Sequence, residues 1–215
     1  MFEMSLADNV FLVAILFLSA IIHEVCHGYA AYFLGDGTAK YQGRLTLNPL
    51  KHIDIVGTII VPVALILMHA GFFFAWAKPV PYNPYNLNKL RSLRWSESIV
   101  AFAGPLSNIV IALLFVLVYW LPSLVNLGFD YSPNFIRAIS IIVLINLSLA
   151  VFNLMPVPPL DGSKLLFNAL PEKFRNIRQM IERYSFVYAI LFIIFVWDYF
   201  AGYLQIIYQW LLGTL

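Results

Sequence analysis

The segment Ala20-Ile-Ile-His-Glu-Val-Cys-His-Gly-Tyr29 places two histidines four residues apart inside a long apolar run. In a helix, residues four apart lie on one face, so His23 and His27 can bind one metal ion together. Glu24 is rotated by about 100° from His23, which lets its carboxylate reach a metal-bound water without being a ligand. The pattern is typical of zinc hydrolases, yet it lies where the apolar sequence predicts a membrane span.

The composition points to a membrane protein. Of the 215 residues, 61% are hydrophobic and only 11% are charged. The mean hydropathy is +0.82, and soluble domains carry roughly 25% charged residues. A single cysteine excludes an internal disulfide framework. We therefore expect one integral membrane domain over residues 1–215, with the lipid bilayer as a partner and without nucleic acid.

Apolar runs and their breaks predict an all-α polytopic membrane protein with about four to six transmembrane helices. Residues 9–34 would span about 39 Å as a helix, enough to cross a bilayer core of roughly 30 Å with tilt. Segment 55–77 is interrupted by Pro62 and Gly71, which predicts a broken or re-entrant segment. Partial alternation in 36–48 predicts a small β-hairpin or sheet element. Further helices are expected at about 97–121, 135–155 and 184–200, with an interfacial helix or further span at 203–214.

Charge predicts the topology. Basic residues are concentrated in three segments, 40–51, 78–94 and 164–183. The positive-inside bias places these segments in the cytoplasm, and the N-terminus and the 122–134 loop outside. Counting crossings then brings the helix end that carries His23 to the same side of the membrane as Asp161.

Asp161 is the candidate for a third metal ligand. Two histidines alone make a poor zinc site, because hydrolytic zinc usually has three protein ligands and one open position for water. Asp161 follows an apolar span and the proline-rich stretch 156–159, which ends the helix and frees the backbone to turn. Gly162 permits a tight geometry beside it. A carboxylate emerging from the bilayer is costly without a cation, so a metal is a natural partner.

Three motifs follow one another along the chain: His23-Glu-Val-Cys-His27, Ala103-Gly-Pro-Leu-Ser-Asn108 and Asn153-Leu-Met-Pro-Val-Pro-Pro-Leu-Asp-Gly162. Together they resemble the site-2 protease family of intramembrane zinc metalloproteases, above all its short bacterial members without a PDZ or other added domain. The resemblance covers residues from about 10 to 170 and implies one Zn²⁺ ion. It implies His23, His27 and Asp161 as zinc ligands. By the same resemblance, Glu24 would be the general base, and Asn153 would help to hold the scissile carbonyl or its oxyanion.

The resemblance also implies a function and a location. We expect an endopeptidase that hydrolyses peptide bonds within or near transmembrane segments of other membrane proteins, in regulated intramembrane proteolysis or in clearing signal-peptide remnants. The expected location is the bacterial cytoplasmic membrane, with the active site toward its cytoplasmic half. An exposed strand edge in 36–48 could pair with an unwound substrate segment. The sequence leaves the oligomeric state open.

Several interpretations have alternatives. Asn153 also suits a simple interhelical hydrogen bond. Asn108 is a possible supporting residue but also suits helix packing, and His52, beside Asp54, is either structural or shapes access to the site. For the whole chain, one alternative is a catalytically silent membrane binding or quality-control protein on the same fold. Another is a metal transporter, which would need ionisable groups on both sides of the membrane, whereas here they cluster toward one side.

Overall fold

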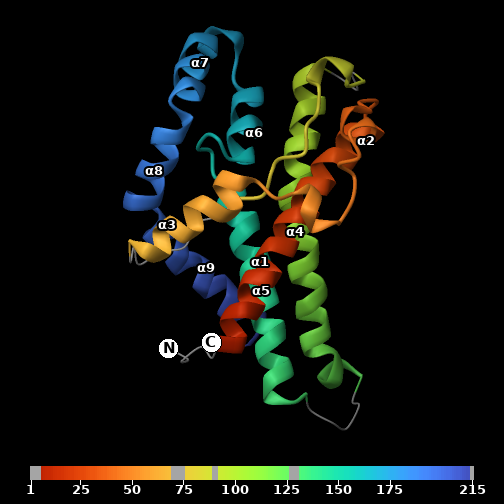
Figure 1. Ribbon diagram of the computed structural model, residues 1–215, viewed down its shortest axis with the longest axis vertical. Helices are drawn as coiled ribbons and strands as arrows, with labels where there is room; N and C mark the ends of the chain where they lie inside the picture. The colour runs from red at the N-terminus through yellow and green to blue at the C-terminus, as the bar shows by residue number, and fades with distance from the viewer. Residues whose placement is uncertain (1–5, 69–75, 89–91, 126–130, 214–215) are drawn as a thin grey trace.

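The computed structural model describes residues 6–68, 76–88, 92–125 and 131–213 (Figure 1). The regular elements in these ranges are all helices, and the ranges contain no strand. The α-helices are α1 (Leu6–Phe33), α2 (Thr38–Tyr41), α3 (Val61–Leu67), α4 (Leu93–Leu124), α5 (Pro133–Leu154), α6 (Asp161–Ala169), α7 (Arg175–Arg183), α8 (Ser185–Phe195) and α9 (Trp197–Leu211). Three short 3-10 helices, η1 (Pro49–Lys51), η3 (Pro84–Asn86) and η4 (Glu172–Phe174), and one π-helix, η2 (Ile55–Ile60), complete the described elements.

Helices α1, α4 and α5 are each long and apolar enough to cross a membrane, and the protein is an integral membrane protein. They correspond to the helices predicted at 9–34, 97–121 and 135–155, so three of the expected four to six spans are supported. Many of their large apolar side chains face outward, as Val13, Leu113 and Leu117 do. An apolar outer surface is suited to lipid, while the helical backbone satisfies its own hydrogen bonds.

These three helices pack together around α4, which contacts both α1 and α5 (Figure 1). Ile21, Val100 and Val143 are among the fully buried apolar side chains of this bundle, one from each helix. An ion pair of 3.0 Å joins Asp8 near the start of α1 to Arg137 near the start of α5. The starts of α1 and α5 therefore lie at one end of the bundle.

The predicted β-hairpin at 36–48 is wrong, because this segment contains the helical turn α2 and no strand. Asp36 Oδ1 accepts a hydrogen bond from the Thr38 N–H at 3.1 Å and initiates the turn. Asp36 Oδ2 accepts another from the Asn83 N–H at 2.7 Å, so side chain to backbone contacts fix this region. Gly43 follows the turn with a φ of +63°, a left-handed conformation that favours glycine. The expected strand edge for substrate pairing is therefore absent from 36–48.

The two ends of segment 55–77 meet. Helices η2 and α3 cover Ile55–Leu67, whereas residues 69–75, including Gly71, lie outside the described residues. The Trp76 N–H donates to the Gly57 carbonyl at 3.2 Å, and the Thr58 hydroxyl donates to the Trp76 carbonyl at 2.9 Å. A Cβ at Gly57 would lie 2.1 Å from the Trp76 ring, so glycine permits this close approach. Residues 77–83, which we call the strap, continue without helix or strand.

The C-terminal helices break earlier than predicted. Instead of one helix at 184–200 and another element at 203–214, α8 ends at Phe195, Val196 leaves the helical conformation with φ −121° and ψ −28°, and α9 begins at Trp197. No proline or glycine lies at this break, so the sequence carried no signal for it. Helix α9 returns to the bundle, where the Trp120 indole N–H donates to the Leu211 carbonyl at 2.9 Å.

Candidate metal centre

Helix α1 presents His23 and His27 on its buried face, with 5% and 8% of each residue exposed. They lie one helical turn apart, and their Nε2 atoms approach within 3.0 Å of each other. Each Nδ1 faces an oxygen: His23 Nδ1 lies 2.7 Å from Asn108 Oδ1, and His27 Nδ1 lies 2.7 Å from the Val100 carbonyl. With an oxygen acceptor at each Nδ1, the neutral form of each ring carries its proton on Nδ1 and a lone pair on Nε2.

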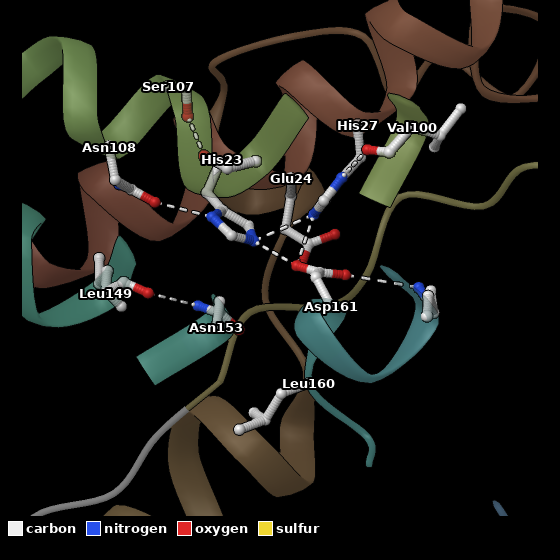
Figure 2. A network of polar contacts seen from close by, with 12 residues as sticks. His23, Glu24, His27, Val100, Ser107, Asn108, Leu149, Asn153, Leu160 and Asp161 are labelled. Atoms are coloured by element: carbon white, nitrogen blue, oxygen red, sulfur yellow. Dashed lines mark hydrogen bonds and ion pairs between the residues drawn. The ribbon is translucent and has the colours of Figure 1, made fainter. Parts of the chain in front are cut away.

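Asp161 reaches the histidines from the first residue of α6. Helix α5 ends at Leu154, and residues 155–160 turn the chain back. A Cβ at Gly162 would lie 2.1 Å from the Leu154 carbonyl oxygen, so only glycine allows this tight return. Asp161 Oδ2 lies 3.1 Å from His23 Nε2 and 3.0 Å from His27 Nε2 (Figure 2). The structure thus brings together the three residues predicted as metal ligands, which we call the triad.

The triad fits a small cation. Its three facing atoms form a triangle with edges of 3.0, 3.0 and 3.1 Å. Tetrahedral zinc ligands at about 2.0–2.2 Å from the metal lie roughly 3.3 Å from one another. All three atoms are hydrogen-bond acceptors, so without a positive charge between them they would repel one another at this distance. Two imidazoles and one carboxylate are also a ligand set of catalytic zinc sites, which keep a fourth position open.

Gly104 of helix α4 leaves space beside the two ligand nitrogens. A Cβ at this position would lie 2.4 Å from His27 Nε2 and 2.6 Å from His23 Nε2. A larger residue at this position would crowd both nitrogens. The 103–108 motif therefore leaves the two nitrogens uncrowded and also supplies the Asn108 contact to His23.

Glu24 is held in place by the strap. Its Oε2 accepts a hydrogen bond from the Val80 N–H at 2.9 Å. The strap is itself anchored, because Arg44 Nη2 donates to the Lys78 carbonyl at 2.9 Å and the Lys78 N–H donates to the His52 carbonyl at 2.9 Å. A backbone donor of fixed position therefore orients the carboxylate next in sequence to the first histidine of the triad.

Lys164 balances part of the charge of the triad. Its Nζ lies 3.4 Å from Asp161 Oδ1, one turn along α6 and on the oxygen that does not face the histidines. Burial is the largest single influence and lowers the pKa of Lys164, but the charges and hydrogen bonds of Asp161, Tyr82 and Glu24 together raise it above its ordinary value. Lys164 therefore stays charged beside the carboxylate.

Comparison with known proteins identifies the family. The model for "Peptidase family M50" matches residues 129–196. The protein named "Putative zinc metalloprotease YwhC" from Bacillus subtilis (strain 168) is 39% identical over 186 residues, which are 85% of this chain and 80% of that protein. The chain belongs to peptidase family M50. Two further relatives, both named "Putative zinc metalloprotease Rip2", are more distant. The one from Mycolicibacterium smegmatis is 27% identical over 82% of this chain and 64% of its own length. The one from Mycobacterium tuberculosis (H37Rv) is 24% identical over 90% of this chain and 70% of its own length. No solved structure matches the chain significantly.

Membership of family M50 confirms the resemblance found in the sequence. The protein is a zinc metalloprotease, and the buried group of His23, His27 and Asp161 is its candidate zinc site. Both histidines belong to α1, which is one of the helices long and apolar enough to cross a membrane. The family implies membrane-protein substrates.

The other predicted site residues differ in their contacts with the triad. Asn108 contacts His23 directly. Asn153 lies apart from the triad in Figure 2, and its Nδ2 donates to the Leu149 carbonyl at 2.9 Å. His52 is fully buried, its Nε2 bonds a backbone carbonyl, and its own carbonyl accepts a hydrogen bond from Lys78 of the strap.

Sequence reasoning missed some contacts that the structure reveals. Lys164 could have been found, because it follows Asp161 by three residues and lies on the same helix face. Gly104 lies one turn before Asn108, but nothing in the sequence indicates that it faces two ligand nitrogens. The Val80 N–H is a backbone group, so it leaves no signal in the sequence at all.

Proposed function

We propose that this M50 zinc metalloprotease is an intramembrane endopeptidase that hydrolyses peptide bonds within or near the transmembrane segments of other membrane proteins. The observation that supports this most directly is the depth of the triad in α1. His23 lies ten residues before Phe33, the last residue of the helix, which corresponds to about 15 Å at 1.5 Å per residue. A site this far inside an apolar span is suited to peptide bonds that themselves lie in the membrane.

We propose His23, His27 and Asp161 as the ligands of one zinc ion and Glu24 as the general base. When bound, zinc would lower the pKa of a coordinated water to about 7 and polarise the scissile carbonyl. Glu24 would accept the proton of this water on its carboxylate and pass it to the leaving amine nitrogen. The Val80 N–H bond to Glu24 Oε2 supports this role, because it orients the carboxylate through an uncharged backbone donor.

We propose Asn153 as the donor to the oxyanion. Its Nδ2 donates to the Leu149 carbonyl, so a change of side-chain rotamer in the substrate complex would be needed to free it. A lost oxyanion donor typically costs about 2.7–4 kcal/mol, or roughly 100-fold to 1,000-fold in kcat. The alternative role, a simple interhelical hydrogen bond, would contribute only about 0.6 kcal/mol, and the bond seen in the structure stays within α5. Turnover of Asn153→Leu therefore separates the two roles, since only an oxyanion donor predicts the large loss.

We place the centre toward the cytoplasmic half of a bacterial cytoplasmic membrane. The basic segments 40–51, 78–94 and 164–183 support this orientation. The Asp8–Arg137 ion pair lies near the starts of α1 and α5, in agreement with an outside location for the N-terminus and the 122–134 loop. The hydrogen-bonded ends of segment 55–77 suit a re-entrant segment that begins and ends on the cytoplasmic side. Substrates would be processed in regulated intramembrane proteolysis or as signal-peptide remnants.

Glu24→Gln tests the proposed chemistry. In purified protein with a transmembrane peptide substrate in detergent micelles, the variant should keep its zinc and lose about 100-fold to 10,000-fold in turnover, the usual contribution of a general base. Glu182→Gln is the matched control, because Glu182 pairs with Arg178 in an exposed ion pair. Continued proteolysis by Glu24→Gln would contradict its role. A wild-type protein that binds zinc but cleaves no transmembrane peptide would instead favour the catalytically silent membrane protein.

A further inference from the structure

We propose that Asn146 and Asn108 form a hydrogen-bond relay that fixes the tautomer of His23 required for binding zinc. Asn146 is then a positioning residue of the metal centre, although it touches no ligand itself. The inference rests on the proposed zinc ligands and extends them to a residue on a third helix. It follows from the direction in which each bond of the relay must run.

The relay starts from a backbone carbonyl. Asn146 Nδ2 lies 2.9 Å from the Ile142 carbonyl oxygen, which can only accept a hydrogen bond. The NH₂ group of Asn146 must therefore point to this carbonyl, and its Oδ1 points toward α4. There Oδ1 accepts a hydrogen bond from Asn108 Nδ2 at 3.0 Å. Asn108 is thereby oriented so that its own Oδ1 faces His23 Nδ1 at 2.7 Å.

A second carbonyl anchors the same direction. Asn108 Nδ2 also lies 3.4 Å from the Ser19 carbonyl oxygen of α1. Turning both amides round would set their oxygens against the Ile142 and Ser19 carbonyls, where neither atom has a proton to share. The relay therefore presents an acceptor to His23 Nδ1, which must carry the proton. His23 Nε2 is left with a free lone pair facing Asp161 Oδ2.

Burial leaves the Asn108 and Asn146 amides with only this orientation. Asn108 and Asn146 are both 0% exposed, and Ser19 is 4% exposed. Bulk water cannot satisfy an amide turned the wrong way, and a buried polar group without a partner costs about 1–3 kcal/mol. The relay joins α5, α4 and α1, so packing of three helices determines the protonation of one imidazole nitrogen.

The two histidine ligands are controlled in different ways. His27 Nδ1 donates directly to the Val100 carbonyl, a backbone group that no side-chain substitution removes. His23 depends on two amide side chains. A substitution at Asn108 or Asn146 should therefore weaken zinc binding through His23 while His27 keeps its tautomer.

Asn153 provides a matched control within the same helix. It lies two turns after Asn146 on α5, and its Nδ2 makes the same type of bond, to the carbonyl four residues earlier, at the same 2.9 Å. Its hydrogen bond belongs to α5 alone, whereas Asn146 continues to Asn108. Asn146→Leu and Asn153→Leu thus remove similar helix contacts, but only Asn146→Leu interrupts the relay.

The experiment measures the zinc affinity of the purified full chain in detergent by competition with a chromogenic chelator. Asn108→Leu should lower the affinity by about 10-fold to 100-fold, the usual effect of removing a partner of a metal ligand. Asn146→Leu should lower it by a smaller factor, on the order of threefold to tenfold. Asn153→Leu should keep the wild-type affinity. In the Asn108→Leu background, Asn146→Leu should have no further effect, because it acts only through Asn108.

Two results would overturn the relay. One is an unchanged affinity in folded Asn108→Leu, and the other is an Asn146→Leu effect of the same size with and without Asn108. Asn108→Asp keeps an acceptor for His23 Nδ1 and should recover affinity relative to Asn108→Leu, whereas a purely structural role predicts no such recovery. If Asn108→Leu does not fold, an unchanged affinity in Asn146→Leu refutes the relay. A wild-type protein without zinc would refute the proposed metal site itself, which the first measurement of the series decides.

Discussion

Substituting Gly104 by alanine adds a single methyl group at the metal centre. The new Cβ would lie 2.4 Å from His27 Nε2 and 2.6 Å from His23 Nε2, whereas real Cβ contacts do not fall below 3.0 Å. The two nitrogens would have to move by about 0.6 and 0.4 Å. Metal sites tolerate ligand distances within about 0.2 Å of their ideal values. Gly104→Ala should therefore abolish the geometry of the centre without altering any ligand.

The expected loss of zinc affinity has a lower limit. Disturbing a group that merely supports a ligand costs about 10-fold to 100-fold in metal affinity. Displacing two ligands should cost at least the upper figure, about 100-fold, which is about 2.8 kcal/mol at 1.4 kcal/mol per tenfold. The zinc-free protein should remain folded, because histidine side chains not bound to a metal can rotate away from the methyl group.

Zinc content per chain and chelator competition measure this effect, and thermal melting of the zinc-free proteins tests the fold. Gly202→Ala in helix α9 is the matched control, because a Cβ there meets nothing within 4 Å. This control should bind zinc normally and gain roughly 0.5–1 kcal/mol of stability from the better helix former. A folded Gly104→Ala protein with wild-type zinc affinity would refute the argument that Gly104 leaves the two nitrogens uncrowded for metal binding.

Three further predictions concern the same centre. Asp161→Ala should lose its zinc, and its melting temperature should match that of chelator-treated wild type. Retention of one zinc ion per chain would exclude Asp161 as a ligand. Gly162→Ala should destabilise the chain or empty the site, because the new Cβ would lie 2.1 Å from the Leu154 carbonyl oxygen, and metal analysis with melting curves would detect either effect. Val80→Pro removes the N–H group that donates a hydrogen bond to Glu24, so kcat should fall by about tenfold while the zinc content stays the same. Unchanged kinetics would show that the strap does not orient the base.

The sequence predicted those features that depend on local composition and helical spacing. Apolar runs located α1, α4 and α5 to within four residues at each end, because a membrane span has a required length and composition. The spacing of His23 and His27 placed both on one face of α1. Asp161 followed from the need for a third ligand and from the proline and glycine residues around it.

Features that depend on contacts distant in sequence were not predictable in this way. The partial alternation in 36–48 suggested strands, but the carboxylate of Asp36 binds backbone groups of the turn and of the strap, which no local pattern reveals. The role of Asn108 depended on which face of α4 meets His23. Asn146 was not among the predicted site residues, since its connection to the centre passes through a second side chain.

The distance along the chain between the ligands has a consequence for the time at which activity arises. His23 and Asp161 are separated by 138 residues, and Asp161 reaches the histidines only after α4 and α5 have been made and Gly162 has packed against the end of α5. With the proposed ligands, a chain of only 160 residues would have two of the three and would not hold a catalytic ion. The protein would therefore be inactive during its own insertion into the membrane, and peptide-bond cleavage would begin only once Asp161 had joined the two histidines.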